Sequence, residues 1–313
     1  MTFSNKNCNF AYNISNFILK RRVFYYNITY ACNNACRDCI SHNVKRHSKR
    51  FIVPEDLMYL DELFHVTPND IWTISGGEPT MSKYLDSIID YAYSISSHIN
   101  MYSNGRNLSL INDCTLSKIE RLLVPIYGTE QTHNLYVSSN NAYNETIESM
   151  SGIIKNDPNK LEIKLMLDNS NSISGFLNSR DWNKIKDNIH FSVSRVLNIE
   201  NQQCPPNVAS EASSIIRSLL KLNKVIRFYD VPFCLLDKDV KDIISTNVDC
   251  SFNFDPIVIC GSIDKRYKLF PFNSPSDYNE DCKGCEHQLL CTKIMQNYFC
   301  PVVDKAVTYI DTE

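Results

Sequence analysis

Two groups of closely spaced cysteines stand out among the 13 cysteines of this 313-residue chain. The first group lies near the start of the chain and consists of Cys32, Cys36 and Cys39, and the second lies near the end and consists of Cys282, Cys285 and Cys291. Thiolates grouped in this way bind zinc ions or iron–sulfur clusters. Residues 1–20 lack the long apolar stretch of an export signal. We therefore expect a cytoplasmic protein whose clustered cysteines bind metal rather than form disulfides.

The first group supplies three ligands, and that number constrains its chemistry. A closed structural zinc site takes four ligands, whereas three thiolates leave one coordination position open for another group. A zinc site completed by His42 or His47 stays open as an alternative. The basic residues 42–50 (HNVKRHSKR) are either a solvated loop or a surface that docks an acidic partner.

Two short segments and one carboxylate carry residue types suited to binding a small ligand. Residues 75–79 (SGGEP) combine two glycines, which allow close approach of a backbone, with a carboxylate that accepts hydrogen bonds from an ammonium group. Residues 103–105 (SNG) form a turn signal, and Asp168 follows an apolar run. Each follows a predicted strand, and sites in parallel sheets lie at the carboxyl ends of strands.

The elements that position these residues alternate in type along the chain. Apolar and β-branched runs predict strands at residues 22–29, 70–75, 98–103, 121–127, 161–167 and 188–196. Helical spacing of apolar residues predicts helices at residues 54–66, 84–95, 109–119, 142–155 and 209–222. This alternation predicts an α/β fold with a parallel sheet and crossover helices. Beyond residue 225 short strands, Pro and Cys dominate. We therefore expect an N-terminal extension (1–21), a core (22–224) and a small cysteine-rich unit (225–313).

The composition excludes several classes of protein. Hydrophobic residues make up 43% and charged residues 21% of the chain, as in an ordinary globular protein. The formal net charge of −3 gives no basic footprint for nucleic acid or an anionic membrane. Because no apolar run approaches about 18 residues, we expect no transmembrane helix.

The first cysteine group and the segment 75–79 together resemble a known family. Residues 27–39 (NITYACNNACRDC) are similar to the signature loop of the radical S-adenosylmethionine (radical SAM) enzymes, and GGEP, about 40 residues later, is similar to their second motif. The resemblance implies a partial (β/α)6 TIM-like barrel with a small cysteine-rich C-terminal extension. It also implies a [4Fe–4S] cluster on Cys32, Cys36 and Cys39, with S-adenosylmethionine (SAM) on the fourth iron. One electron then cleaves SAM to methionine and a 5′-deoxyadenosyl radical, which abstracts hydrogen from a substrate.

The same resemblance implies which residues contact SAM. They are Gly76, Gly77, Glu78, Pro79, Ser103, Asn104 and Asp168. The chain departs from the family pattern at Asp38, where relatives usually carry a bulky apolar or aromatic residue that packs near the adenine. Residues 127–133 are also similar to a loop of peptide-modifying members in which a His precedes a helix. We expect His133 to be a solvated loop residue, with a catalytic role as the alternative, and we assign no catalytic residue.

The second cysteine group resembles the auxiliary-cluster extensions called SPASM or twitch domains. The resemblance implies a second [4Fe–4S] cluster on Cys282, Cys285, Cys291 and Cys234. Cys260 or Cys300 stays open as the fourth ligand, and a pair of clusters that also uses Cys250 stays open as well. A zinc knuckle is the other alternative.

These features predict a radical SAM enzyme that acts on a ribosomally made precursor peptide by crosslinking, epimerisation or oxidation. Auxiliary clusters in relatives usually accompany peptide substrates, and we expect an electron donor of the flavodoxin or ferredoxin type. A small-molecule substrate such as a nucleoside, sugar or amino acid is the first alternative. A non-catalytic iron–sulfur or zinc sensor is the second.

Overall fold

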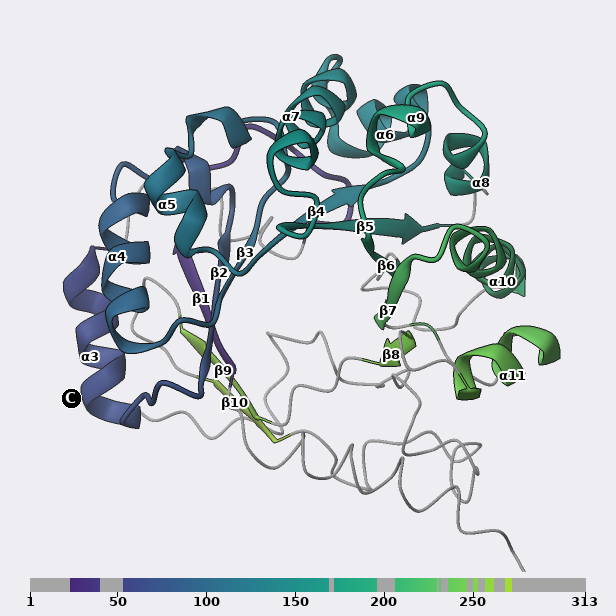
Figure 1. Ribbon diagram of the computed structural model, residues 1–313. Coiled ribbons are helices and arrows are strands. Elements are labelled where there is room, and N and C mark those ends of the chain that lie inside the picture. The colour runs from purple at the N-terminus through teal and green to yellow at the C-terminus, as the bar shows by residue number, and fades with distance from the viewer. Residues whose placement is uncertain are drawn as a thin grey trace, which may run out of the picture.

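A curved, open sheet forms the centre of the molecule (Figure 1). The computed structural model describes residues 23–39, 53–168, 172–195, 206–229, 231, 236–246, 250–252, 257–261 and 268–271. In this part of the chain the sheet has ten strands in the order β10-β9-β1-β2-β3-β4-β5-β6-β7-β8. Neighbouring strands pair in parallel, except β9 and β10, which are antiparallel.

The first six strands confirm the six that the sequence predicts. They are β1 (Val23–Thr29), β2 (Ile71–Gly76), β3 (Ile99–Tyr102), β4 (Arg121–Ile126), β5 (Leu161–Leu167) and β6 (His190–Arg195). Four more strands extend the same sheet at its two ends: β7 (Val225–Tyr229), β8 (Cys250–Phe252), β9 (Ile257–Gly261) and β10 (Lys268–Pro271). The α/β class and the partial, unclosed TIM-like barrel are therefore confirmed.

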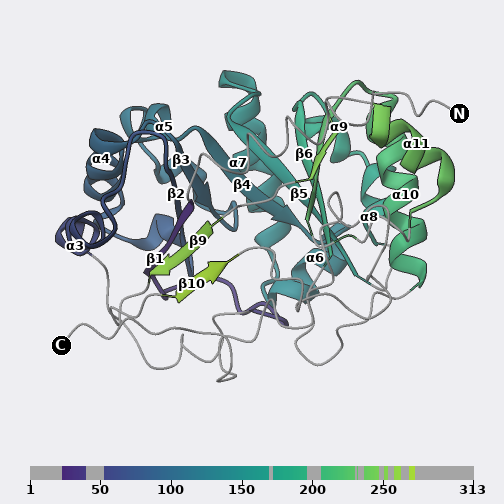
Figure 2. The same cartoon turned by 90° about the horizontal axis from the view of Figure 1, so that it is seen from below.

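Helices line the outer side of the strand arc (Figures 1 and 2). The longer ones are α3 (Pro54–Phe64), α4 (Leu85–Ile95), α7 (Ala142–Asn156), α10 (Pro206–Leu220) and α11 (Lys238–Thr246). The shorter ones are α5 (Asp113–Lys118), α6 (Glu130–Val137), α8 (Ser172–Leu177) and α9 (Trp182–Ile185), with the 3-10 turns η1 (Pro79–Met81) and η2 (Leu108–Leu110). No helix in the described ranges is long and apolar enough to cross a bilayer.

The prediction of a single helix at residues 109–119 was wrong, because the chain forms two separate elements there, η2 and then α5. The break has a local cause. The side chain of Asn112 accepts a hydrogen bond from the backbone N–H of Thr115 at 2.8 Å, and so caps a new helix. Residues 130–137, which we treated as loop, form α6.

The two faces of the sheet differ in character. Phe24, Ile28 and Trp72 are fully buried in one apolar cluster that also contains helix residues such as Leu57 and Ile88. Because side chains alternate along a strand, the intervening residues lie on the opposite face of the sheet. These include Thr73, Asn100, Arg121, Glu162, Ser192 and Arg227. The concave face is therefore largely polar.

A buried charge on this polar face has two partners. The Glu162 carboxylate is fully buried, and its Oε2 atom lies 3.2 Å from Arg121 Nη1 and 2.9 Å from Arg227 Nη1. These groups link β4, β5 and β7. Because both arginines share the Glu162 carboxylate, the trio connects three strands on this polar face of the sheet.

The division of the chain into three units stays a prediction. Residues 1–21 and 272–313 lie outside the described residues. The described strands after residue 225 join the central sheet, since β9 pairs with β1 and β7 pairs with β6.

Candidate active site

The carboxyl ends of β1, β2 and β3 and the helix α6 meet around the first cysteine group. We call residues 30–39, which follow β1, the cysteine loop. Its three thiols, Cys32, Cys36 and Cys39, are all partly exposed, and none forms a disulfide. The loop has little secondary structure of its own, so its shape depends on contacts with these neighbours.

The start of the cysteine loop is bound to the segment after β2. The backbone N–H of Gly77 donates to Thr29 O at 2.6 Å, and that of Glu78 donates to Ala31 O at 2.8 Å. A Cβ atom on Gly77 would lie only 2.2 Å from Ala31 O, and one on Gly76 would lie 2.2 Å from Thr29 O. Gly76 also has a φ of +128°, which L side chains rarely adopt. The two glycines therefore allow the segment to pack directly on the loop.

The middle of the cysteine loop is bound to α6. The backbone N–H of Ala35 donates to Val137 O at 3.0 Å, and that of Arg37 donates to Tyr136 O at 2.9 Å. These carbonyls belong to the last turn of α6, where a helix leaves its C=O groups without internal partners. The loop thus satisfies the end of α6, and α6 fixes the backbone around Cys36.

Glu78 lies beneath this junction, fully buried. Its Oε1 atom accepts from Thr80 N at 3.1 Å, Thr80 Oγ1 at 2.8 Å and Ser103 Oγ at 2.9 Å, and its Oε2 atom accepts from Asn104 N at 2.6 Å. Burial raises the pKa of the carboxyl, while these hydrogen bonds act to lower it. Glu78 therefore joins the ends of β2 and β3. Its contact with SAM stays a prediction, as does that of the neighbouring buried Pro79.

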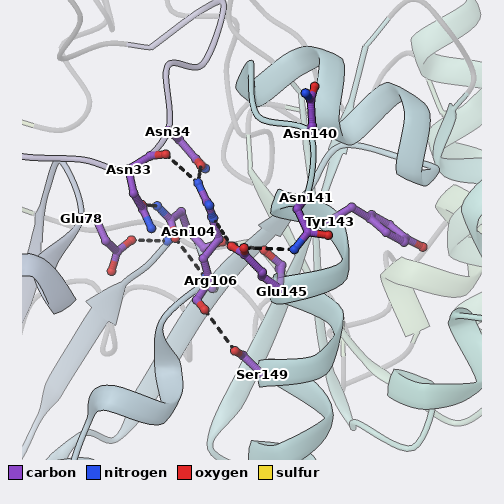
Figure 3. A network of polar contacts seen from close by, with 12 residues as sticks. Asn33, Asn34, Glu78, Asn104, Arg106, Asn140, Asn141, Tyr143, Glu145 and Ser149 are labelled. Carbon is purple, nitrogen blue, oxygen red and sulfur yellow. Dashed lines mark hydrogen bonds and ion pairs between the residues drawn. The ribbon is translucent and has the colours of Figure 1, made fainter.

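Asn104 points from the end of β3 toward the cysteine loop (Figure 3). Its Nδ2 atom donates to Asn33 Oδ1 at 2.5 Å and lies 3.9 Å from Cys32 Sγ. Asp168, at the end of β5, acts electrostatically on the guanidinium of Arg37 in the loop and raises its pKa, although Asp38 has the larger effect. The predicted residues at three strand ends thus lie around one loop.

Arg106 was not among the predicted site residues. Its Nη1 atom donates to Asn33 O at 2.6 Å and to Asn34 Oδ1 at 2.9 Å, and its Nε atom donates to Glu145 Oε2 at 2.5 Å (Figure 3). The only sequence signal is its place directly after Gly105. Its partners are more than 35 positions away in the chain.

The prediction of a solvated His133 was wrong. The residue lies in α6 with 1% of its surface exposed, between the rings of Tyr127 and Tyr143. Burial, and then the charge of Arg106, lower the pKa of His133 to about 4. Its Nδ1 atom accepts from Tyr127 N at 3.4 Å, so the ring is neutral with its proton on Nε2. Among the residues that the structure describes, no group hydrogen-bonds to that buried Nε2 atom.

Two stacked tyrosines lie beside Asp38. The ring centroids of Tyr127 and Tyr136 are 3.9 Å apart, and both Tyr127 and Cys36 pack against a small cluster that contains Tyr136. Asp38 accepts from Arg37 Nε at 3.0 Å. Burial and the neighbouring Asp38 raise the pKa of Tyr136. The aromatic surface next to the cysteine loop therefore comes from β4 and α6, while the loop position itself carries a carboxylate.

The donor set of the loop fits an iron–sulfur cluster. Among the residues that the structure describes, no three Cys, His, Asp or Glu side chains converge closely enough to hold a single metal ion. Three cysteine thiols in one loop are the donor type that iron–sulfur clusters take in proteins. The backbone N–H of Asn34 donates to Cys32 Sγ at 3.4 Å, a type of hydrogen bond that tunes such clusters.

Several predicted ligands lie outside the described residues. They are Cys234, Cys282, Cys285, Cys291 and Cys300, together with His42 and His47. Cys260 lies in β9, opposite Tyr25 of β1, and Cys250 begins β8. The auxiliary cluster and its ligand set stay predictions.

Comparison with known proteins shows what the fold resembles. The sequence matches no family model, and it matches no curated protein. The structure is similar to that of anSMEcpe with bound AdoMet and Cp18Cys peptide, with a TM-score of 0.58 and 13% identity over 87% of this chain and 88% of that one.

Two further solved structures share the architecture. One is SuiB of Streptococcus suis, with a TM-score of 0.54 and 10% identity over 85% of this chain and 66% of that one. The other is HydG, a maturase of the [FeFe]-hydrogenase, with a TM-score of 0.51 and 12% identity over 83% of this chain and 62% of that one. At such low identity the likeness shows a common fold, and this chain has that fold.

Proposed function

We propose that this protein is a radical SAM enzyme that modifies a peptide. The observation that carries the proposal is the cysteine loop, in which three thiols follow β1 and are fixed from both sides by the GGEP segment and α6. The shared fold adds support, because anSMEcpe is a protein with bound AdoMet and a bound peptide.

In this proposal Cys32, Cys36 and Cys39 hold a [4Fe–4S] cluster and leave one iron without a protein ligand. A cluster held there would supply the one-electron reduction that cleaves SAM to methionine and a 5′-deoxyadenosyl radical, the species that would take a hydrogen atom from the substrate. The protein chain itself positions the cysteine loop and covers part of it. The α6 contacts fix the loop backbone, and the Tyr127–Tyr136 pair covers the loop beside Cys36 with apolar surface.

The proposed SAM contacts surround the cysteine loop. Gly76 and Gly77 lie against Thr29 and Ala31 at the start of the loop. Pro79 follows in the same segment, and Ser103 and Asn104 follow the neighbouring strand. Asp168 lies within electrostatic reach of the loop. Glu78 is a proposed SAM contact as well, and its carboxylate also fixes the Asn104 backbone.

The remaining parts of the proposal concern residues outside the described ranges. A second cluster bound by Cys234, Cys282, Cys285 and Cys291 would take an electron from a substrate radical or bind the peptide. A flavodoxin or ferredoxin would supply electrons through an acidic surface, matched to the basic residues 42–50.

The test is cleavage of SAM by anaerobically reconstituted full-length protein with dithionite. We expect 5′-deoxyadenosine by liquid chromatography and mass spectrometry from wild-type protein. We expect none from a variant with Cys32, Cys36 and Cys39 changed to Ala. Cys114→Ala, at an exposed cysteine on α5, is the matched control and should retain activity. Iron-loaded wild-type protein that releases no 5′-deoxyadenosine would favour a sensor and refute the proposal.

The peptide part is tested separately by co-expression with any small peptide that is encoded beside the gene. A mass change in that peptide that depends on the three cysteines supports it. An unmodified peptide, with SAM cleavage intact, would point to a small-molecule substrate instead.

A further inference from the structure

Arg106 connects three separate parts of the site. It follows β3, it donates two hydrogen bonds to Asn33 and Asn34 of the cysteine loop, and it pairs with Glu145 of α7 (Figure 3). We infer that Arg106, oriented by Glu145, is a positioning residue that holds the loop between Cys32 and Cys36 and places a fixed positive charge beside the metal cluster. The inference rests on the proposed function in one respect, namely that the three thiols bind a cluster.

The geometry of the pair explains why an arginine is needed. The guanidinium presents its donors in a rigid, planar fork, so one side can bind the loop while the other binds a carboxylate. In Arg106, Nη1 donates hydrogen bonds to Asn33 O and Asn34 Oδ1, and Nε donates one to Glu145 Oε2. A lysine would keep the charge and would lose this division of contacts.

The pair is itself held in place. The side chain of Arg106 is 14% exposed, and that of Glu145 is 35% exposed. The other Glu145 oxygen, Oε1, accepts from Asn141 Nδ2 at 3.1 Å, and the backbone carbonyl of Arg106 accepts from Ser149 Oγ at 3.3 Å. The N-terminal half of α7 thus aims the guanidinium at the loop.

The loop segment that Arg106 holds leads directly to a predicted ligand. Asn34, whose side chain accepts from Arg106, donates its own backbone N–H to Cys32 Sγ at 3.4 Å. Asn33 is held by Arg106 at its carbonyl and by Asn104 at its side chain. Residues 33 and 34 therefore depend on side chains from β3 and its following turn, whereas Ala35 and Arg37 are held by α6.

The charge has a consequence that a purely structural contact lacks. Reduction adds an electron to a cluster, so a nearby positive charge favours the reduced state and raises the midpoint potential. A nearby negative charge lowers it. Removal of the Arg106 charge should therefore lower the potential. Removal of the Glu145 charge should raise it, since the guanidinium then loses its counter-charge.

The first experiment is a redox titration of full-length holoenzyme followed by electron paramagnetic resonance, at equal iron content. Arg106→Gln should lower the midpoint potential, Arg106→Lys should leave it close to wild type, and Glu145→Gln should raise it. Arg217→Gln, which removes an exposed arginine paired with Asp237 and Asp239, is the matched control and should change nothing. Equal potentials in Arg106→Gln and wild type would overturn the electrostatic part.

The second experiment uses the metal-free full-length chain and does not depend on a cluster. Hydrogen–deuterium exchange at residues 33 and 34 should be about tenfold or more faster in Arg106→Gln than in wild type, the order expected for losing a charge-assisted hydrogen bond. Arg106→Lys should show intermediate exchange. Unchanged exchange in Arg106→Gln would overturn the positioning role. Wild-type protein that binds no cluster, but shows this pattern, would refute the proposed function and leave the loop contact standing.

If Arg106→Gln fails to assemble a cluster, Glu145→Gln decides the electrostatic part, because it keeps the arginine and its loop contacts. A raised potential in that variant supports the inference. A potential equal to that of wild type contradicts it.

Discussion

Replacement of Glu78 tests whether the end of β2 is fixed in the way that the structure indicates. Its buried carboxylate accepts hydrogen bonds from the backbone N–H groups of Thr80 and Asn104 and from two hydroxyl groups. Glu78→Ala removes every one of these acceptors at once. The hydroxyl groups can rotate toward other partners, but the two backbone donors cannot.

The size of the expected loss of stability follows from those two backbone donors. Leaving a buried donor unpaired costs about 1–3 kcal/mol, so Glu78→Ala should lower the free energy of unfolding by about 2–6 kcal/mol. That is a large share of the roughly 5–15 kcal/mol that stabilises a typical domain. Glu78→Gln keeps one acceptor oxygen and avoids burying a charge, so we expect a smaller cost of about 1–2 kcal/mol.

The pH dependence of the free energy of unfolding provides a second, independent test. Burial raises the pKa of Glu78, so above the unfolded pKa the folded state binds more protons than the unfolded state. The contribution of this group to stability is therefore complete below the unfolded pKa and is lost as pH rises through the folded pKa. Glu78→Gln has no such loss. The stability advantage of wild type over Glu78→Gln should shrink as pH rises from about 4.3 toward neutrality.

Urea unfolding of the metal-free chain, followed by tryptophan fluorescence, measures these differences, because both tryptophans, Trp72 and Trp182, are buried. Glu148→Ala, at an exposed position of α7, is the matched control and should stay within about 0.5 kcal/mol of wild type. The reasoning is refuted if Glu78→Ala unfolds like this control. A gap between wild type and Glu78→Gln that is constant with pH would contradict the assigned pKa shift.

Three further predictions use other contacts. Gly77→Ala would bring a Cβ to 2.2 Å from Ala31 O, so this variant should fail to incorporate iron. In Gly152→Ala the new Cβ meets nothing within 4 Å, so this control should keep its iron and stabilise α7 by about 0.5–1 kcal/mol. Equal iron content in the two variants would contradict this prediction. Glu162→Ala removes the buried carboxylate that Arg121 and Arg227 both contact, so it should lower the free energy of unfolding by about 3–5 kcal/mol in urea titrations. An unchanged midpoint would refute this prediction. His133, with a pKa of about 4, binds fewer protons in the folded state than in the unfolded state. The free energy of unfolding of wild type should therefore fall by up to about 3 kcal/mol as pH falls from 6.5 to 4, and that of His133→Phe should lack this fall. Parallel pH profiles of the two proteins would exclude a buried neutral ring.

Element type along the first two thirds of the chain was predictable because the periodicity of apolar residues is strong there. Strands such as β5 carry apolar residues on one face throughout, and helices such as α7 bury one stripe. The pairing of β9 with β1 was not predictable, since a five-residue apolar run shows its type but not its partner. The same holds for β8, which is only three residues long.

The helix α6 shows a different limit. Its eight residues, EQTHNLYV, have weak helical patterning, and its position depends on hydrogen bonds to the cysteine loop. Once α6 forms there, it carries His133 into an aromatic cluster with Tyr127 and Tyr143. A residue that looks solvated in sequence is therefore buried by tertiary packing.

The site itself was predictable where a motif combines residue types with a strand end. The cysteine loop and the GGEP segment meet as neighbouring parallel strands require, and the structure gives the glycines a steric reason. The role of Arg106 could not be predicted from the sequence, because its partners Asn33 and Glu145 are distant in the chain. An arginine after a turn is also too common to mark a site. The protein contacts of Glu78 were not predictable either, since its partners Ser103 and Asn104 lie 25 and 26 positions away in the chain.

The most direct test of the proposed chemistry is the electron paramagnetic resonance spectrum of the reduced, reconstituted enzyme before and after addition of SAM, with iron and zinc quantified in the same sample. We predict a [4Fe–4S] signal that changes shape when SAM is added and that disappears when Cys32, Cys36 and Cys39 are replaced. A sample that contains zinc at these thiols, or a cluster signal that SAM leaves unchanged, would contradict the proposed function.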